Sequence, residues 1–133
     1  MANAYAQYQT VSLDGESAYE ELYSRLARWT DEARHFYQAS SEAEAEYRLE
    51  RSIELLGYMD RGLDLSGTPE IVKAILSLHR FAISALVKAK AERDSKELAQ
   101  LVPVFLSMGE IFAAIRVWLR ASERISVTDL GIV

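Results

Sequence analysis

Two histidines are the residues of this chain whose type and spacing could support chemistry. Glu32 and His35 stand three residues apart, the spacing at which di-iron bundles present two ligands from one helix. Such a site needs a second pair and two more inward carboxylates, which the predicted core positions do not supply. His79 is compatible with a histidine phosphotransfer domain, but the bulky Phe81 two residues later would hinder a donor. We therefore expect no metal site, with His35 on the surface and His79 at the edge of the core.

Other enzyme chemistry finds little support. The chain contains no cysteine, which excludes a thiol nucleophile, cysteine-based zinc sites and iron–sulfur clusters. No arrangement typical of a catalytic triad and no glycine-rich phosphate loop occurs. Carboxylate pairs such as Glu20 and Glu21 fall in first helical turns, where the helix dipole favours anions. The sequence therefore predicts a protein that is not an enzyme and that needs no cofactor.

Charge and hydropathy exclude two further classes of partner. Twenty acidic residues outnumber fifteen basic ones, and a net charge of −5 argues against binding nucleic acid. The most apolar stretch, residues 102–119, is interrupted by Pro103, Glu110 and Arg116, which argues against a membrane span. The first ten residues lack the cationic and apolar segments of a signal peptide. A soluble cytoplasmic protein is the expectation.

Apolar residues recur at helical spacing in four segments. The predicted core stripe of the second segment is Ala45, Leu49, Ser52 or Ile53, Leu56, Met59 and Leu63, and that of the third is Ile71, Ile75, Leu78, Ala82, Leu86 and Ala89. Short connections between long helices favour an all-α, antiparallel up-down four-helix bundle. We assign residues 1–14 to an extended N-terminal arm, 15–122 to the bundle and 123–133 to a C-terminal tail; a short fifth helix is the alternative for residues 120–133. The helices are expected from about Ser17 to Gln38, from Ser41 to about Gly62, from Pro69 to just before Asp94, and from Ser95 to Ser122.

Helix-terminus signals support these boundaries. Ser17 with Glu20, and Ser41 with Glu44, have the spacing of capping boxes. Pro69 suits a first helical position because its missing N–H would be unpaired there in any case. Asp94 marks the start of the last helix. Pro103 falls inside that helix, where we expect a bend.

The chain carries more apolar surface than a small bundle needs. In the last helix one stripe suffices for a core: Leu98, Leu101, Phe105, Met108, Phe112, Ile115 and Leu119. Further apolar residues occupy its other faces: Val102, Val104, Leu106, Ile111, Val117 and Trp118. A chain of 133 residues has little protein to cover them, which indicates a partner.

Applying the same reasoning to each helix gives a predicted partner-binding surface. It consists of Ile53, Leu56, Val72, Leu76, Ile83, Val87, Ile111 and Trp118. For each single position an ordinary core role is the alternative. Tyr5 and Tyr8, two aromatic residues in a polar arm, are predicted to cover this surface or to contact the partner. A self-associating structural or adaptor bundle, with a weak homodimer, would also use such a surface.

Three segments carry a further signal: the arm Tyr5-Ala6-Gln7-Tyr8-Gln9, the junction from Gly62 to Ile71, and the run from Leu78 to Asp94. In order and spacing they resemble the flagellin-specific export chaperone family FliS, to which the last run aligns without gaps. The resemblance covers residues 4 to about 112. The chain departs from the family pattern at Ser17-Ala18, where the family usually has proline, and at His79-Arg80-Phe81, where it has Tyr-x-Tyr.

The resemblance implies a function for the excess apolar surface. FliS-like chaperones hold the disordered C-terminal segment of flagellin in apolar grooves in the cytoplasm. They prevent premature polymerisation and present flagellin to the flagellar export gate. Flagellin is thus the expected partner, and amphipathic client helices would lay their apolar faces on the bundle. Self-association, and less favourably phosphotransfer through His79, remain the alternatives.

Overall fold

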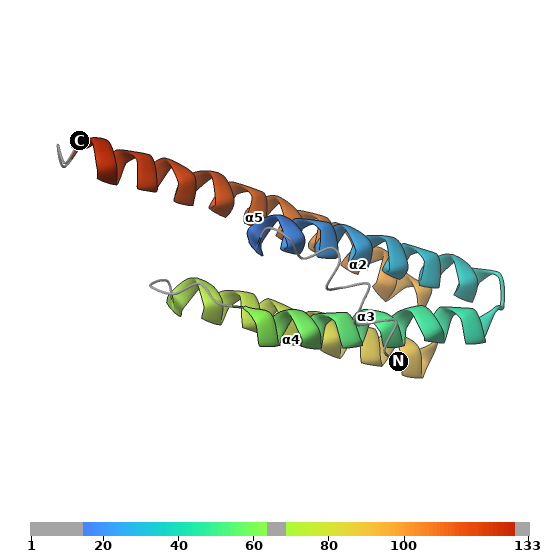
Figure 1. The fold of residues 1–133 in the computed structure, drawn as a ribbon. Helices are drawn as coiled ribbons and strands as arrows, with labels where there is room; N and C mark the ends of the chain where they lie inside the picture. The colour runs from blue at the N-terminus through green and yellow to red at the C-terminus, as the bar shows by residue number, and fades with distance from the viewer. Residues whose placement is uncertain (1–14, 64–68, 130–133) are drawn as a thin grey trace. The chain divides into compact units, whose positions relative to one another are not determined.

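The computed structural model describes residues 15–63 and 69–129 of the chain (Figure 1). Those residues form four helices and no strand: α2 (Gly15–Gln38), α3 (Glu42–Gly62), α4 (Pro69–Glu92) and α5 (Ser95–Asp129). The predicted all-α fold is confirmed. The predicted arm, residues 1–14, lies outside the described residues. The chain divides into two compact units, one of residues 25–105 and one whose described parts are residues 15–24 and 106–129.

The unit of residues 25–105 contains segments of all four helices, and its side-chain contacts fix their directions. Helices α3 and α4 pack together. Lys90 Nζ lies 2.8 Å from Glu50 Oε1, and Asp60 contacts His79 further along. As the residue number rises from 50 to 60 on α3, the partner on α4 falls from 90 to 79. The two helices are therefore antiparallel, as Figure 1 shows.

The other neighbouring helices of this unit also pair in opposite directions. Arg48 Nε of α3 lies 3.4 Å from Glu32 Oε1 of α2, and the Arg51 guanidinium lies 5.6 Å from the centroid of the Trp29 ring. Residues later in α3 thus contact residues earlier in α2. Two residues, Arg93 and Asp94, join α4 to α5. Lys88 Nζ before them lies 3.6 Å from Glu97 Oε2 after them, so the chain reverses there. The predicted antiparallel four-helix arrangement is confirmed within this unit.

The core of the same unit follows most of the predicted stripes. The buried side chains contributed by α3 and α4 are Ala45, Leu49, Ser52, Leu55, Leu56, Met59, Ile75, His79, Ala82, Ala85, Leu86 and Ala89. One expectation was wrong by a single position. Leu78, predicted for the core, is 38% exposed, and His79 is fully buried in its place. An imidazole can be buried there because Asp60 supplies a polar partner.

Two helices end in left-handed residues that are not glycine. Ser40 and Arg93 have φ values of 61° and 56°. Beyond them, Ser41 N donates to Phe36 O at 2.8 Å and Asp94 N donates to Ala89 O at 3.1 Å. These six-to-one bonds belong to the Schellman motif, which supplies partners for the last helical carbonyls.

Ser40 offers a test of this turn. Ser40→Gly is expected to stabilise the protein by roughly 0.5–1 kcal/mol, because glycine adopts a positive φ without the steric cost that a Cβ brings. The melting temperature in thermal unfolding followed by circular dichroism should rise by about 4 °C. Gln38→Gly, inside the last turn of α2, should instead lower it. An equal loss in both variants would contradict the account.

The structure confirms some of the predicted helix starts and contradicts others. Asp94 Oδ1 accepts a hydrogen bond from Lys96 N at 2.9 Å, which confirms the cap of α5. Pro69 is the first residue of α4, as expected. Ser41 is the N-cap residue of α3, as expected, but its side chain makes no cap bond, so the capping box itself is absent. The box at Ser17 was wrong, because α2 begins at Gly15.

Helix α5 is longer than the sequence indicated. It continues through Pro103 and past the expected end at Ser122 to Asp129. Residues 123–129 are therefore part of α5 and form neither a tail nor a separate fifth helix. No glycine or proline occurs between Ser122 and Gly131, so nothing in the chain stops the helix earlier.

In the second unit the first turns of α2 contact the middle of α5. The Phe112 ring lies 5.1 Å from that of Tyr19 and 5.4 Å from that of Tyr23, centroid to centroid. Arg116 Nε pairs with Glu20 Oε1 at 2.7 Å. Three aromatic rings at these separations form an apolar cluster, and the ion pair lies beside it.

Candidate partner-binding surface

Four of the predicted surface residues share one flank of α4. Val72, Leu76 and Ile83 are partly exposed, and Val87 is 52% exposed. At 100° per residue they fall within an arc of about 60°. We call these four residues the α4 strip. The strip borders the buried stripe of α4 without belonging to it, so it presents apolar atoms at the edge of the core.

The flank of α3 that faces α4 extends this surface. The pairs Glu50–Lys90 and Asp60–His79 mark that flank, and Ile53 lies between them on the same side of α3 at helical spacing. Ile53 is partly exposed. Leu56, by contrast, is fully buried. It is a core residue in this structure, and we leave it out of the surface.

Gly57 leaves a gap on this flank of α3. A Cβ placed there would meet only the Arg61 guanidinium, at 3.8 Å. Packing therefore does not demand glycine at this mid-helix position, where it costs about 1 kcal/mol relative to alanine. Because Gly57 has no side chain, no Cβ projects from α3 beside Ile53.

Within the described residues, some charged groups beside the α4 strip form ion pairs and others do not. Lys90 Nζ donates a hydrogen bond to Glu50 Oε1, and this bond raises the pKa of the Lys90 ammonium. Asp60 is engaged by His79. Arg61, Lys73 and Arg80 are all exposed. None of the ion pairs within the described residues involves these three cations.

A second exposed apolar region of α4 was not predicted. Phe81 is 59% exposed. It lies six positions before Val87, which places the two side chains about 120° apart around the helix. From the sequence, Phe81 was interpreted only as a bulky residue that would hinder a donor at His79. The angle between Phe81 and the core stripe around the helix could have predicted that its ring is exposed.

The second unit exposes further apolar groups on α5. Ile111 and Trp118, both predicted, are 47% and 57% exposed, and Leu106 and Val117 are exposed as well.

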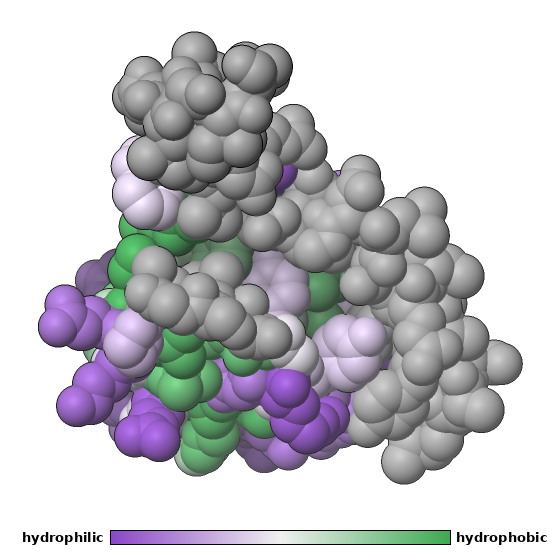
Figure 2. Space-filling view, turned by 60° about the vertical axis from the view of Figure 1, so that its left-hand side comes forward, coloured by the Kyte–Doolittle hydropathy of each residue, from purple (hydrophilic) through white to green (hydrophobic). Residues whose placement is uncertain are grey.

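The segment Ser95–Trp118 of α5 is long and apolar enough to cross a membrane, by length and composition only. Some of it, such as Leu98 and Phe105, is core. Only 28% of its most apolar window is buried, so much of the helix is open to a partner. Figure 2 shows hydrophobic surface lying uncovered beside hydrophilic groups on one face.

One comparison with known proteins decides the family. Residues 1–117 match the family model described as flagellar protein FliS. The chain belongs to the FliS family. No individual curated protein matches the chain significantly. FliS proteins are chaperones of flagellar export rather than enzymes, and the partner of the family is flagellin.

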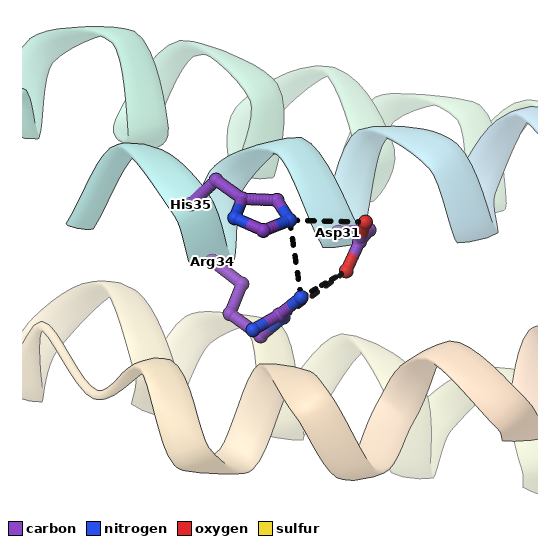
Figure 3. Close-up of polar contacts among 3 residues, drawn as sticks. All are labelled: Asp31, Arg34 and His35. Carbon is purple, nitrogen blue, oxygen red and sulfur yellow. Dashed lines mark hydrogen bonds and ion pairs between the residues drawn. The ribbon is translucent and has the colours of Figure 1, made fainter. Parts of the chain in front are cut away.

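In this FliS-family chain the two histidines have structural settings. His35 is exposed: its Nε2 lies 3.4 Å from Asp31 Oδ2 and 3.1 Å from Arg34 Nη2, and Arg34 also pairs with Asp31 (Figure 3). Glu32, the other half of the Glu-x-x-His spacing, pairs with Arg48 of α3. The expectation of a surface histidine is confirmed, and the two candidate ligands are turned to different partners.

His79 does not fit the phosphotransfer alternative. Its side chain is fully buried, and its Nδ1 contacts Asp60 Oδ1. A phosphoryl-accepting histidine must be reachable by its donor. The hypothesis is therefore wrong for His79, which links α3 to α4 inside the bundle.

Three carboxylates gather where α4 meets α5. Oxygens of Glu92, Asp94 and Glu97 lie within 4.8 Å of one another. Two of them have structural roles, because Asp94 caps α5 and Glu97 pairs with Lys88. Exposed acidic clusters of this kind are common at helix starts.

The predicted arm residues Tyr5 and Tyr8 lie outside the described residues. Within those residues, the surface predicted from sequence separates into the α4 strip with Ile53 in one unit, and Ile111 with Trp118 in the other.

Proposed function

We propose that this FliS-family chain is a cytoplasmic flagellar export chaperone that binds the disordered C-terminal segment of flagellin. The client segment folds into amphipathic helices on the apolar surface, with Tyr5 and Tyr8 of the arm contacting or covering that surface. Binding prevents premature polymerisation, and the complex is presented to the export gate.

The observation that carries this proposal is the α4 strip, an apolar flank left partly exposed in a FliS-family bundle. A disordered client must recover its ordering entropy from burial. Burying ~1,000 Å² of apolar area is worth ~25 kcal/mol before those costs are subtracted. A surface with few fixed polar contacts also suits a client that must later be released.

Titration with the C-terminal segment of the flagellin from the same organism tests the function. Fluorescence anisotropy of the labelled segment should show a Kd below about 10 μM, and far-UV circular dichroism should show helix gained beyond the sum of the free components. A scrambled segment of the same composition is the control. A folded protein that leaves the segment unbound at tens of micromolar would remove the proposal.

Self-association is a second candidate, favoured by the exposure of Val117 and Trp118 on α5. Sedimentation equilibrium separates the two functions. A tight dimer that the flagellin segment neither binds nor dissociates would support self-association. A monomer that forms a one-to-one complex would support the chaperone.

A further inference from the structure

The apolar flank between α3 and α4 is bordered by cations that have no carboxylate partner within the described residues. Lys73 and Arg80 are exposed and stand seven residues apart, so they share one face of α4. That face borders the α4 strip, because Arg80 lies about 40° from Leu76 and about 20° from Val87 around the helix.

Arg61 adds a third positive charge from α3. It follows Asp60, whose contact with His79 brings this end of α3 beside the Arg80 turn of α4. Of the carboxylates on the facing flank of α3, Glu50 and Asp60 are engaged by Lys90 and His79. Glu54 is exposed and lies on the same face of α3 as Arg61, seven residues earlier. The α4 side of the border is therefore basic, through Lys73 and Arg80, on a chain whose net charge is −5, while Glu54 offsets Arg61 on α3.

We propose that the α4 strip binds an amphipathic helix with carboxylates along one edge, which pair with Lys73, Arg80 and Arg61. The inference rests on the proposed function and specifies the charge pattern of the client helix. Two positions seven residues apart rise ~10.5 Å along a helix axis. Acidic residues at heptad spacing on the client would therefore match Lys73 and Arg80 along α4.

The gap at Gly57 is consistent with the same occupant. The Arg61 guanidinium is the one group that a Cβ there would meet. Arg61 is exposed and flexible, so it can turn from Gly57 towards a client carboxylate while an apolar client side chain takes its place. Such a pairing adds specificity and a faster on-rate more than affinity.

Two labelled model peptides test the charge pattern directly. Both are amphipathic helices with the same apolar face, and they differ only in carrying glutamate or lysine at heptad spacing along one edge. We expect the wild-type protein to bind the glutamate peptide at least tenfold more tightly at 50 mM salt. The preference should shrink at 500 mM salt, because screening shortens the reach of exposed charges.

Charge reversal identifies the residues responsible. The double variant Lys73→Glu/Arg80→Glu should lose the preference for the glutamate peptide or invert it. The matched control Arg28→Glu/Lys96→Glu changes net charge equally at two other exposed cations and should retain it. Equal binding of the two peptides by the wild type, or equal effects of the two double variants, would overturn the inference.

The flagellin segment separates this inference from the function on which it rests. If the wild type binds the segment but ignores edge charge in the peptides, the charge pattern is wrong and the chaperone function stands. If neither the segment nor either peptide binds, both are overturned.

Discussion

Val87→Asp is expected to weaken binding of the flagellin segment at least tenfold. Val87 is 52% exposed on the α4 strip, so its remaining surface is available to a client helix. An aspartate there would be covered by the client without a designed partner, and burying an unpaired charge costs well over the 1.4 kcal/mol that corresponds to a tenfold change. Fluorescence anisotropy with the labelled segment measures the loss.

Phe81 supplies a matched control on the same helix. It is 59% exposed, but it lies about 120° from Val87 around α4 and outside the strip. Phe81→Asp introduces the same charge at a similarly exposed apolar position. We expect it to leave binding within about twofold of the wild type. Comparable losses in the two variants would show that charge on α4, rather than the strip, governs binding.

Folding must be monitored in both variants. Because both side chains are exposed, each substitution should change the free energy of unfolding by less than about 1 kcal/mol. Circular dichroism and urea unfolding provide that measurement. A Val87→Asp variant that unfolds with the wild type yet binds with full affinity would remove the α4 strip from the proposed site.

The α4 strip could be predicted from sequence because helical angle alone defines it. Val72, Leu76, Ile83 and Val87 follow one another at helical spacings beside a separate core stripe. Periodicity is a property of the chain and survives folding. The same method placed Leu56 on the partner-binding surface, whereas it is fully buried. Leu56 lies at the boundary between the core stripe and the exposed flank of α3, where packing against neighbouring helices decides burial.

Helical periodicity could not predict the burial or the backbone conformation of some single residues. Leu78 and His79 are adjacent, and hydropathy favours the leucine for the core. Burial of His79 depends on Asp60, nineteen residues away on another helix. The left-handed turn residues Ser40 and Arg93 are likewise set by tertiary context, since neither is the glycine that a Schellman turn usually carries.

The His79–Asp60 contact gives the largest expected change in stability. His79 is fully buried, while Asp60 is partly exposed. Asp60→Leu removes the carboxylate and leaves the imidazole in the core without it. A hydrogen bond to a charged group contributes about 1.5–3 kcal/mol, and because Asp60 is partly exposed we expect a loss of about 2 kcal/mol. Urea unfolding followed by circular dichroism measures the loss.

A double-mutant cycle then separates the pair from its surroundings. His79→Leu alone should also destabilise, because it leaves Asp60 without its partner. Combining the two should restore most of the stability, since replacing both partners of a buried hydrogen bond by apolar groups of similar shape can be nearly neutral. The coupling energy should exceed about 1 kcal/mol. Additive losses would mean that the two side chains contribute independently, and that hydrophobic packing alone holds α3 against α4 at this level of the bundle.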